Sequence, residues 1–252
     1  MSTFLNAEDG YYSLTSTGTI AVIVLTVVLV IATALIRRSA GTSAADLEAD
    51  GAGPKSEPAK NGSFSIKQLV FSGVALALAF ALSYIKIIPM PWGGSVTAGS
   101  MLLVTLVGYW YGPKIGFTAA FAYSLLQFVQ DGSTYILSPL QACLDYFFAF
   151  TALGASGFFR GKKNSLRTGY LVAIILRGLF HTIGGYLYWM DYMPESFPKS
   201  LAAVYPFCYN YAFIGLEAVI TLVIISIPAV VKVIARITAM AREEELNEVS
   251  AI

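Results

Sequence analysis

His181 is the only histidine of this 252-residue chain, and it stands in an apolar segment long enough to cross a membrane. Arg177 precedes it by four residues, and Tyr188 and Trp189 follow it by seven and eight. Polar side chains are costly in hydrocarbon, so they normally face the interior of a helix bundle or a wet cavity. This spacing therefore predicts a ligand pocket that combines an imidazole, a guanidinium and aromatic rings.

Other hydrophobic segments place acidic, amide and phenolic side chains at a comparable depth. They are Asp145 and Tyr146, then Tyr205, Asn210 and Glu217, and finally Tyr123 and Gln127. An aromatic face attracts a cation by about 0.5–2 kcal/mol, and a carboxylate can accept amine hydrogens or balance a positive charge. Such a set suits a small, flat, nitrogen-rich ligand, cationic ligands included.

These residues also have structural interpretations. His181 can serve only to hydrogen-bond between helices, and Arg177 can pair with Glu217 and hold two helices together. Aromatic residues at segment ends commonly form the belt at the membrane interface. Belt residues do not require an Asp, a His and an Asn as companions, so the clustering on three segments favours the pocket.

The sequence lacks the motifs of nucleotide, metal and hydrolase chemistry. It contains no Gly-x4-Gly-Lys-Ser/Thr, no His-Glu-x-x-His and no Gly-x-Ser-x-Gly. Its two cysteines, Cys143 and Cys208, lie in hydrophobic segments without the spacing of metal ligands. We therefore expect no catalytic residue, no metal and no cofactor, and the chain cannot drive transport with ATP by itself.

Composition indicates the class of protein. The chain is 56% hydrophobic and 12% charged, with a mean hydropathy of +0.68, whereas soluble domains carry about 25% charged residues. The net charge of +1 provides no basic field for nucleic acid. We expect an all-α polytopic membrane protein in the lipid bilayer.

The chain divides into four regions. A membrane-spanning helix needs about 20 mostly apolar residues, and residues 1–38 hold one such span from Gly18 to Ile36. Residues 39–65 have the polar composition of a disordered linker, and residues 236–252 form a cytoplasmic tail. Between them, residues 66–235 form a six-helix core, with segments expected at 66–87, 99–111, 115–130, 136–159, 169–190 and 205–235.

The second core segment is short, and helix breakers precede it in Ile87-Ile-Pro-Met-Pro-Trp-Gly-Gly-Ser95. This stretch is either an external loop or a re-entrant cap over a cavity, because non-helical backbone at membrane depth must be covered by protein or water.

Lysine and arginine indicate the orientation. Thirteen of the sixteen fall in alternate connections, at 37–67, Lys114, 160–167 and the tail after Val231. Since basic connections stay in the cytoplasm, we expect the N-terminus outside the cell membrane and the C-terminus in the cytoplasm. Within the first core segment, Gly73-x-x-x-Ala77 allows another helix to approach closely. That helix can be a neighbour in the bundle or an external partner.

Three stretches, taken in order, resemble a known family. They are Tyr135-Ile-Leu-Ser-Pro-Leu-Gln-Ala-Cys-Leu-Asp145-Tyr146 followed by Leu-Gly-Ala-Ser-Gly-Phe-Phe-Arg160, then His181-Thr-Ile-Gly-Gly-Tyr-Leu-Tyr-Trp189, and then Tyr205-Pro-Phe-Cys-Tyr-Asn210. Together they are similar to the thiamine-specific S components (ThiT type) of energy-coupling factor (ECF) transporters. The resemblance covers residues 66–235.

The resemblance implies a six-helix S-component core that binds thiamine near the extracellular face, for ATP-driven uptake by partner subunits. Gly73 and Ala77 would dock on the transmembrane T subunit, which carries two ABC-type ATPases. The implied thiamine contacts are Asp145, Tyr146, His181, Trp189, Tyr205 and Asn210, with Tyr123 where the family can have a tryptophan and Trp92 in the loop that caps the pocket.

One departure concerns the ligand, because the family's pocket acid is typically Glu and this chain has Asp145, which is one methylene shorter. A phosphate ester or a precursor of thiamine is therefore an alternative ligand. Three alternative functions remain: an S component for another vitamin, an intramembrane enzyme that uses His181 and Asp145 as acid and base, and a ligand-free membrane adaptor.

Overall fold

The computed structural model describes residues 5–8, 11–14, 16, 20, 64–91, 93–131 and 136–250, with side chains throughout except at 5–8, 11–14 and 244–250. The expected N-terminal span apart from Ile20, most of the expected linker and Trp92 lie outside the described residues.

Helices dominate the described chain, as predicted. The first three are α2 (Ile66–Ser83), α3 (Ser100–Tyr111) and α4 (Pro113–Asp131). A continuous run follows, made of α5 (Pro139–Ala142), η1 (Cys143–Phe148), α6 (Ala149–Thr151) and η2 (Ala152–Phe159). The remaining elements are α7 (Ser165–Tyr188), η3 (Met190–Tyr192), η4 (Lys199–Val204), α8 (Tyr205–Ile224) and α9 (Pro228–Ser250). Two antiparallel hairpins join them, β1 (Leu5–Glu8) with β2 (Tyr11–Leu14) and β3 (Lys86–Pro89) with β4 (Ser95–Thr97).

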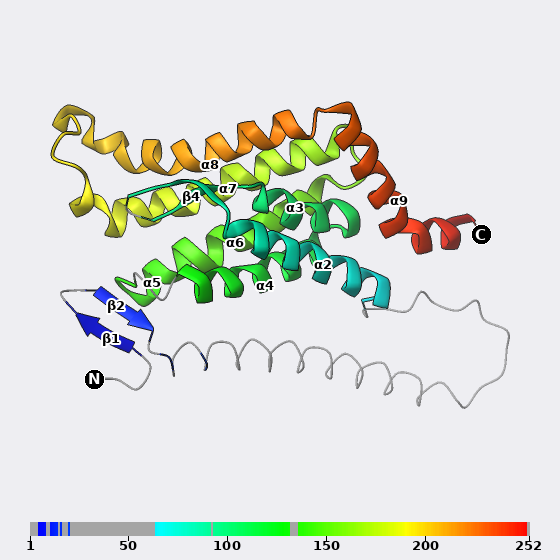
Figure 1. Cartoon of the computed structure of the whole chain (residues 1–252), viewed down its shortest axis with the longest axis horizontal. Helices are drawn as coiled ribbons and strands as arrows, with labels where there is room; N and C mark the ends of the chain where they lie inside the picture. The colour runs from blue at the N-terminus through cyan, green and yellow to red at the C-terminus, as the bar shows by residue number, and fades with distance from the viewer. Residues whose placement is uncertain are drawn as a thin grey trace, which may run out of the picture.

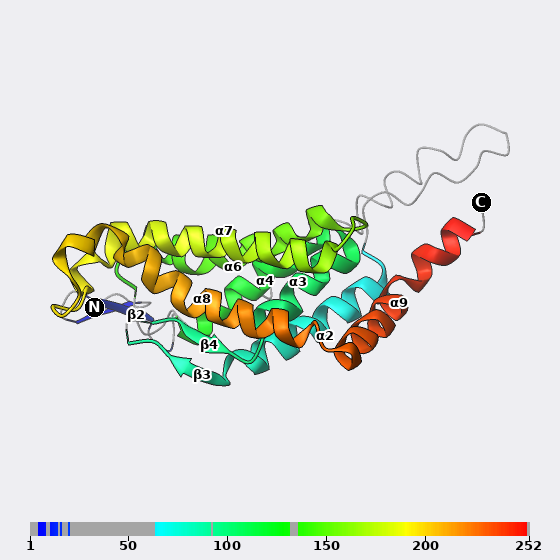
Figure 2. The same cartoon turned by 90° about the horizontal axis from the view of Figure 1, so that it is seen from above.

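Four of the described helical stretches are long and apolar enough to cross a membrane: Ile66–Ser83, Pro139–Phe159, Ser165–Tyr188 and Lys199–Ile224. The protein is therefore a multi-pass membrane protein. The antiparallel helices α7 and α8 lie side by side along the long axis, and residues 189–204 connect them at one end of the bundle (Figures 1 and 2). The helix α9 lies at the other end (Figures 1 and 2).

The helices cross closely where the sequence supplies glycine. A Cβ built on Gly157 would lie 2.5 Å from the backbone nitrogen of Pro113, and one on Gly154 would lie 2.5 Å from the Cα of Phe117. Both distances are too short for any side chain. The η2 segment therefore packs backbone to backbone against the first turns of α4.

Two segments differ from the expectation. Residues 205–235 are not one helix, because α8 ends at Ile224 and a new helix starts at Pro228. Proline lacks the backbone N–H of a continuing helix and disfavours helical geometry in the residue before it. The stretch before α3 forms the hairpin β3–β4, and its residues line a cavity.

Candidate functional site

A cavity of about 310 Å³ lies between the hairpin β3–β4 and the helices α4, α5–η1, α7 and α8. This volume is at the lower end of the range of about 300–1,000 Å³ that is typical of small-molecule sites. Six of the eight residues expected from the resemblance line it: Asp145, Tyr146, His181, Trp189, Tyr205 and Asn210. Three further pocket candidates from the sequence, Arg177, Gln127 and Glu217, also line it.

Asp145 is the most constrained group in the cavity. It lies in η1, a π-helical turn, which is a rare geometry that often marks functional sites. Its Oδ2 accepts hydrogen bonds from Gln141 Nε2 at 2.7 Å and from Trp189 Nε1 at 2.9 Å. Its Oδ1 is 3.4 Å from His181 Nδ1. The carboxylate is thus held at a fixed position beside an indole and an imidazole.

Two adjacent glycines in α7 make this arrangement possible. A Cβ on Gly184 would lie 2.5 Å from Asp145 Oδ1, and a Cβ on Gly185 would lie 2.7 Å from Pro206 Cβ. Without side chains at these positions, α7 can approach both η1 and α8. The pair therefore brings Asp145, His181 and Asn210 to one cavity.

His181 has one ring nitrogen, Nε2, that can accept a hydrogen bond from a ligand or donate one to it. Its ring meets Phe150 and Phe213 edge to face at centroid distances of 6.3 and 6.2 Å. The Nε2 atom is buried and has no hydrogen-bond partner in the described part of the chain. A proton on Nδ1 directed at Asp145 would leave Nε2 as an acceptor for a ligand N–H.

The α8 wall is aromatic and carries one amide. The ring centroids of Tyr205 and Tyr209 lie 5.8 Å apart, and those of Tyr209 and Phe213 lie 6.2 Å apart. Asn210 Nδ2 donates to the carbonyl oxygens of Pro206 at 2.9 Å and His181 at 3.2 Å. These two donor contacts orient the amide and leave its oxygen available to a ligand donor.

The hairpin closes one side of the cavity and is attached to α8 through the end of β4 and through the turn between the strands. Glu217 Oε2 accepts from Thr97 N at 2.7 Å and from Thr97 Oγ1 at 2.8 Å, and Tyr209 OH donates to Gly93 O at 3.0 Å. On the α4 side, Lys86 Nζ lies 3.2 Å from Asp131 Oδ1. The hairpin is therefore a structured cover over the cavity.

Arg177 and Glu217 are both buried and both line the cavity. The direct ion pair between them, which the sequence left open as a structural alternative, does not form among the described residues. The guanidinium instead stacks on Phe150, 4.3 Å from the ring centroid. Arg177 Nε and Glu217 Oε1 have no hydrogen-bond partner among the described residues. The two charges thus face one cavity from α7 and α8 without neutralising each other by contact.

Tyr123 is not part of the cavity lining. It is fully buried, and its hydroxyl accepts from Gln127 Nε2 at 3.1 Å and lies 3.4 Å from Ala79 O. Its hydroxyl therefore helps to position Gln127, which lines the cavity. Tyr188 also lies off the lining, and Trp92 is outside the described residues. The sequence reasoning missed Gln141, Thr97, Lys86 and Asp131, whose roles depend on contacts with distant segments.

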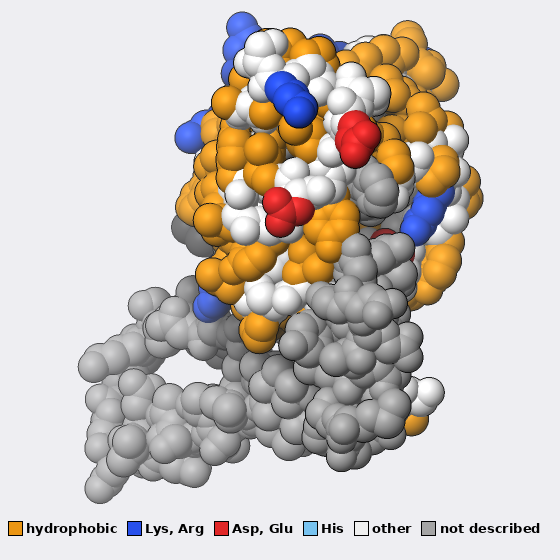
Figure 3. Space-filling view, turned by 90° about the vertical axis from the view of Figure 1, so that its left-hand side faces the viewer, with side chains coloured by type: hydrophobic (Ala, Val, Ile, Leu, Met, Phe, Trp, Pro, Cys, Tyr) orange, Lys and Arg blue, Asp and Glu red, His pale blue; other side chains and the backbone are white. Residues whose placement is uncertain are grey.

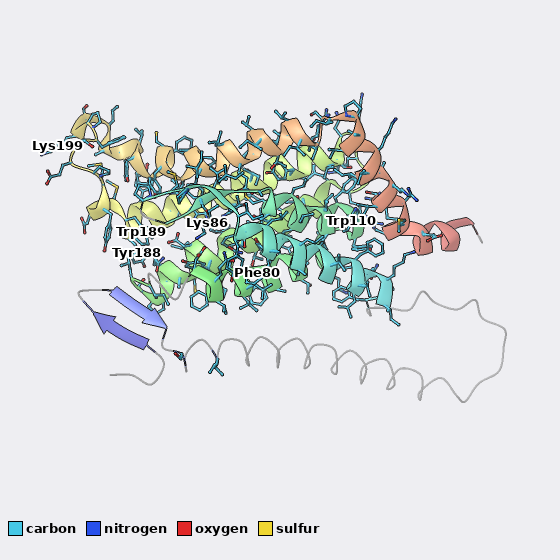
Figure 4. All side chains as sticks on the ribbon, viewed as in Figure 1. Phe80, Lys86, Trp110, Tyr188, Trp189 and Lys199 are labelled. Carbon is cyan, nitrogen blue, oxygen red and sulfur yellow. The ribbon has the colours of Figure 1, made fainter. Side chains whose placement is uncertain are left out.

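The cavity lies toward one end of the bundle. Trp189 lies toward the end where α7 and α8 are connected, Trp110 lies near α9, and Lys86 lies between them (Figure 4). Seen from the α7–α8 connection, the surface is mostly hydrophobic with scattered acidic and basic side chains (Figure 3). Within the described residues, no three Asp, Glu, His or Cys side chains come together as a metal site.

Comparison with known proteins identifies relatives of this chain. Residues 69–236 match the model of a family described as thiamine transporter protein. The thiamine transporter ThiT of Bacillus subtilis (strain 168) is 27% identical over 168 residues, which cover 61% of this chain and 85% of that protein.

Two solved structures are also similar. A structure of ThiT from Listeria monocytogenes is 19% identical, covers 64% of this chain and 94% of that chain, and has a TM-score of 0.50. It shows that the fold is shared. A structure of the S component of a bacterial ECF transporter is 21% identical, covers 62% of this chain and 92% of that chain, and has a TM-score of 0.43.

Proposed function

Because this chain belongs to the thiamine transporter protein family, we propose that it is the substrate-binding S component of an ECF-type transporter and holds thiamine in the cavity beneath β3–β4. The family is one of transporters, so the cavity binds a cargo and performs no reaction on it. ATP-driven uptake would be the work of partner subunits, since the chain has no nucleotide motif.

The carboxylate of Asp145 is the observation that carries this proposal. Thiamine joins an aminopyrimidine to a cationic thiazolium, so it needs an acceptor for an amine and a counter-charge. Asp145 can supply both, at the nitrogen edges of the Trp189 and His181 rings. A charge-assisted hydrogen bond contributes about 1.5–3 kcal/mol, and a desolvated cation–π contact adds about 2 kcal/mol.

The other contacts follow from the lining. Tyr146 and Tyr205 extend the aromatic walls, and the Asn210 amide oxygen can accept from the ligand. Tyr123 would act through Gln127 rather than on thiamine itself. For Trp92, a place in the cap over the ligand remains a proposal from the resemblance.

Tryptophan fluorescence tests the ligand. Purified protein titrated with thiamine should lose emission saturably, because Trp189 lines the cavity. The substitution Trp189→Phe should remove much of the quenching, whereas Trp110→Phe should retain it, because Trp110 lies at the other end of the bundle. Folded protein that neither shows quenching nor releases heat on thiamine addition would contradict the proposal. Competition by riboflavin or biotin would instead assign another vitamin.

The helix α2 is the proposed docking surface for the T subunit, which carries two ABC-type ATPases. Gly73 and Ala77 are exposed, and a Cβ on Gly73 would meet nothing within 4 Å. The small residues thus point away from the bundle, beside exposed Val70 and Val74. This outward placement supports the external-partner alternative.

Bulky residues on this surface should separate uptake from binding. We expect Gly73→Leu with Ala77→Leu to abolish thiamine uptake by the assembled transporter and to leave thiamine affinity unchanged. Uptake is measured in cells, and affinity is measured on the purified chain. Wild-type uptake by the double variant would exclude this face as the docking site.

The orientation proposal also has structural support. Lys114, Arg160, Lys162 and Lys163 begin α4 or follow η2, at the end opposite the cavity. With that end in the cytoplasm, the cavity opens toward the outside, where thiamine is captured. The N-terminus before the expected first span would then lie outside and the C-terminus inside.

A further inference from the structure

The helix α9 has no role in the proposed binding site, and it continues past residue 236, where the family match ends. Its inner face packs on the end of α3. Trp110 Nε1 donates to Thr238 Oγ1 at 3.1 Å, Tyr111 OH donates to Ala241 O at 3.2 Å, and Arg242 Nε donates to Trp110 O at 3.2 Å. The helix is therefore a fixed part of the structure.

An exposed side of α9, next to the face that packs on α3, carries an apolar stripe. Val233, Ile237 and Met240 are 57%, 37% and 52% exposed. Their spacing of four and three residues places them on one helical face. Lys232 and Arg236, both exposed, are one turn apart and run along one edge of this stripe. No described residue covers the stripe.

The position of α9 relative to the membrane follows from its connection to α8. The membrane-spanning stretch Lys199–Ile224 ends three residues before α9 begins at Pro228. Three residues span at most roughly 10 Å, so α9 must start at the membrane surface. The aromatic side chains of Tyr109 and Trp110, which contact α9 through Arg242 and Thr238, are of the type that marks this interface.

We propose that α9 lies in the cytoplasmic interface of the membrane, with Val233, Ile237 and Met240 at the boundary of headgroups and acyl chains and with Lys232 and Arg236 on anionic lipid headgroups. An apolar face with a basic flank is the pattern of an interfacial helix. Acidic residues begin only at Glu243, which pairs with Lys67 at 3.0 Å. The lipid-binding part is therefore residues 228–242.

A fluorescent probe on the stripe tests this arrangement in the full-length chain. A polarity-sensitive dye is attached to Met240→Cys after Cys143 and Cys208 are replaced by alanine. The protein is placed in nanodiscs of phosphatidylcholine with or without phosphatidylglycerol. The matched control is Ala235→Cys, an exposed position on nearly the opposite side of α9, given about 3.6 residues per turn.

With phosphatidylglycerol present, the dye at position 240 should emit at shorter wavelength, be quenched by brominated lipid and be protected from aqueous iodide. The dye at position 235 should behave in the opposite way. Lys232→Gln and Arg236→Gln should each lower the ratio of inserted to water-exposed probe about fivefold. Thermal unfolding of each variant confirms that it is folded, so the test does not depend on thiamine.

Two outcomes would overturn the inference. One is a dye at position 240 that is quenched by iodide as strongly as the dye at position 235 in every lipid mixture. The other is a dye that becomes protected only when the transporter's partner subunits are added, which would assign the stripe to a protein interface.

Discussion

Replacing Asp145 by alanine is expected to weaken thiamine binding by about 10- to 100-fold. The change removes a charge-assisted hydrogen bond of about 1.5–3 kcal/mol, and each 1.4 kcal/mol corresponds to a factor of ten. It also leaves the donors of Gln141 and Trp189 without their common acceptor. Calorimetric titration of the purified protein measures the effect, since the emission of Trp189 will itself change.

Two further variants separate the charge of Asp145 from its position. Asp145→Asn keeps the shape and removes the charge, so it should lose most of the affinity. Gly184→Ala keeps the charge but places a methyl group 2.5 Å from Oδ1, so the carboxylate must move and binding should weaken. Gly215→Ala makes the same chemical change where nothing lies within 4 Å, and it should bind normally. Wild-type affinity in Asp145→Ala would remove this residue from the site.

The membrane class and most of the cavity wall were predictable because both depend on local pattern. Apolar length predicts a span, and helical spacing predicts which side chains share a face. Arg177 and His181 on α7, and Asn210 and Glu217 on α8, therefore reach the cavity together as expected, although Tyr188 of the same expected stripe does not. The thiamine assignment came from resemblance, since spacing alone indicated only a flat, nitrogen-rich ligand.

Contacts between distant segments were not predictable in this way. Thr97 and Glu217 are separated by 120 positions and meet only because β4 packs on α8. The π-helical turn around Asp145 shifts the helical phase by about one residue relative to a regular helix, and periodicity cannot reveal it. Tyr123 has a helical phase compatible with the cavity, yet its side chain is directed at Ala79 of α2.

Removing either charge of Arg177 or Glu217 should destabilise the protein strongly. Each group is buried, and its nearest compensation is the opposite charge across the same cavity. Glu217→Gln preserves an oxygen for Thr97 but leaves Arg177 as a lone buried cation, and Arg177→Met leaves Glu217 as a lone anion. Either change should lower the free energy of unfolding by about 3 kcal/mol, the lower end for a broken buried pair because the two groups are not in contact. Thermal and denaturant unfolding in detergent measures this.

The double variant distinguishes mutual compensation from two separate roles. If the charges stabilise each other, Arg177→Met with Glu217→Gln should cost less than the sum of the single changes by about 0.5–3 kcal/mol. The pair Lys86 and Asp131 is the matched control, because its side chains are 40% and 43% exposed and an exposed pair contributes only about 0–1 kcal/mol. Breaking it should hardly change stability. Additive losses at Arg177 and Glu217 would mean that neither charge compensates the other, and that each is retained for contacts of its own with the hairpin, with Phe150 or with the bound ligand.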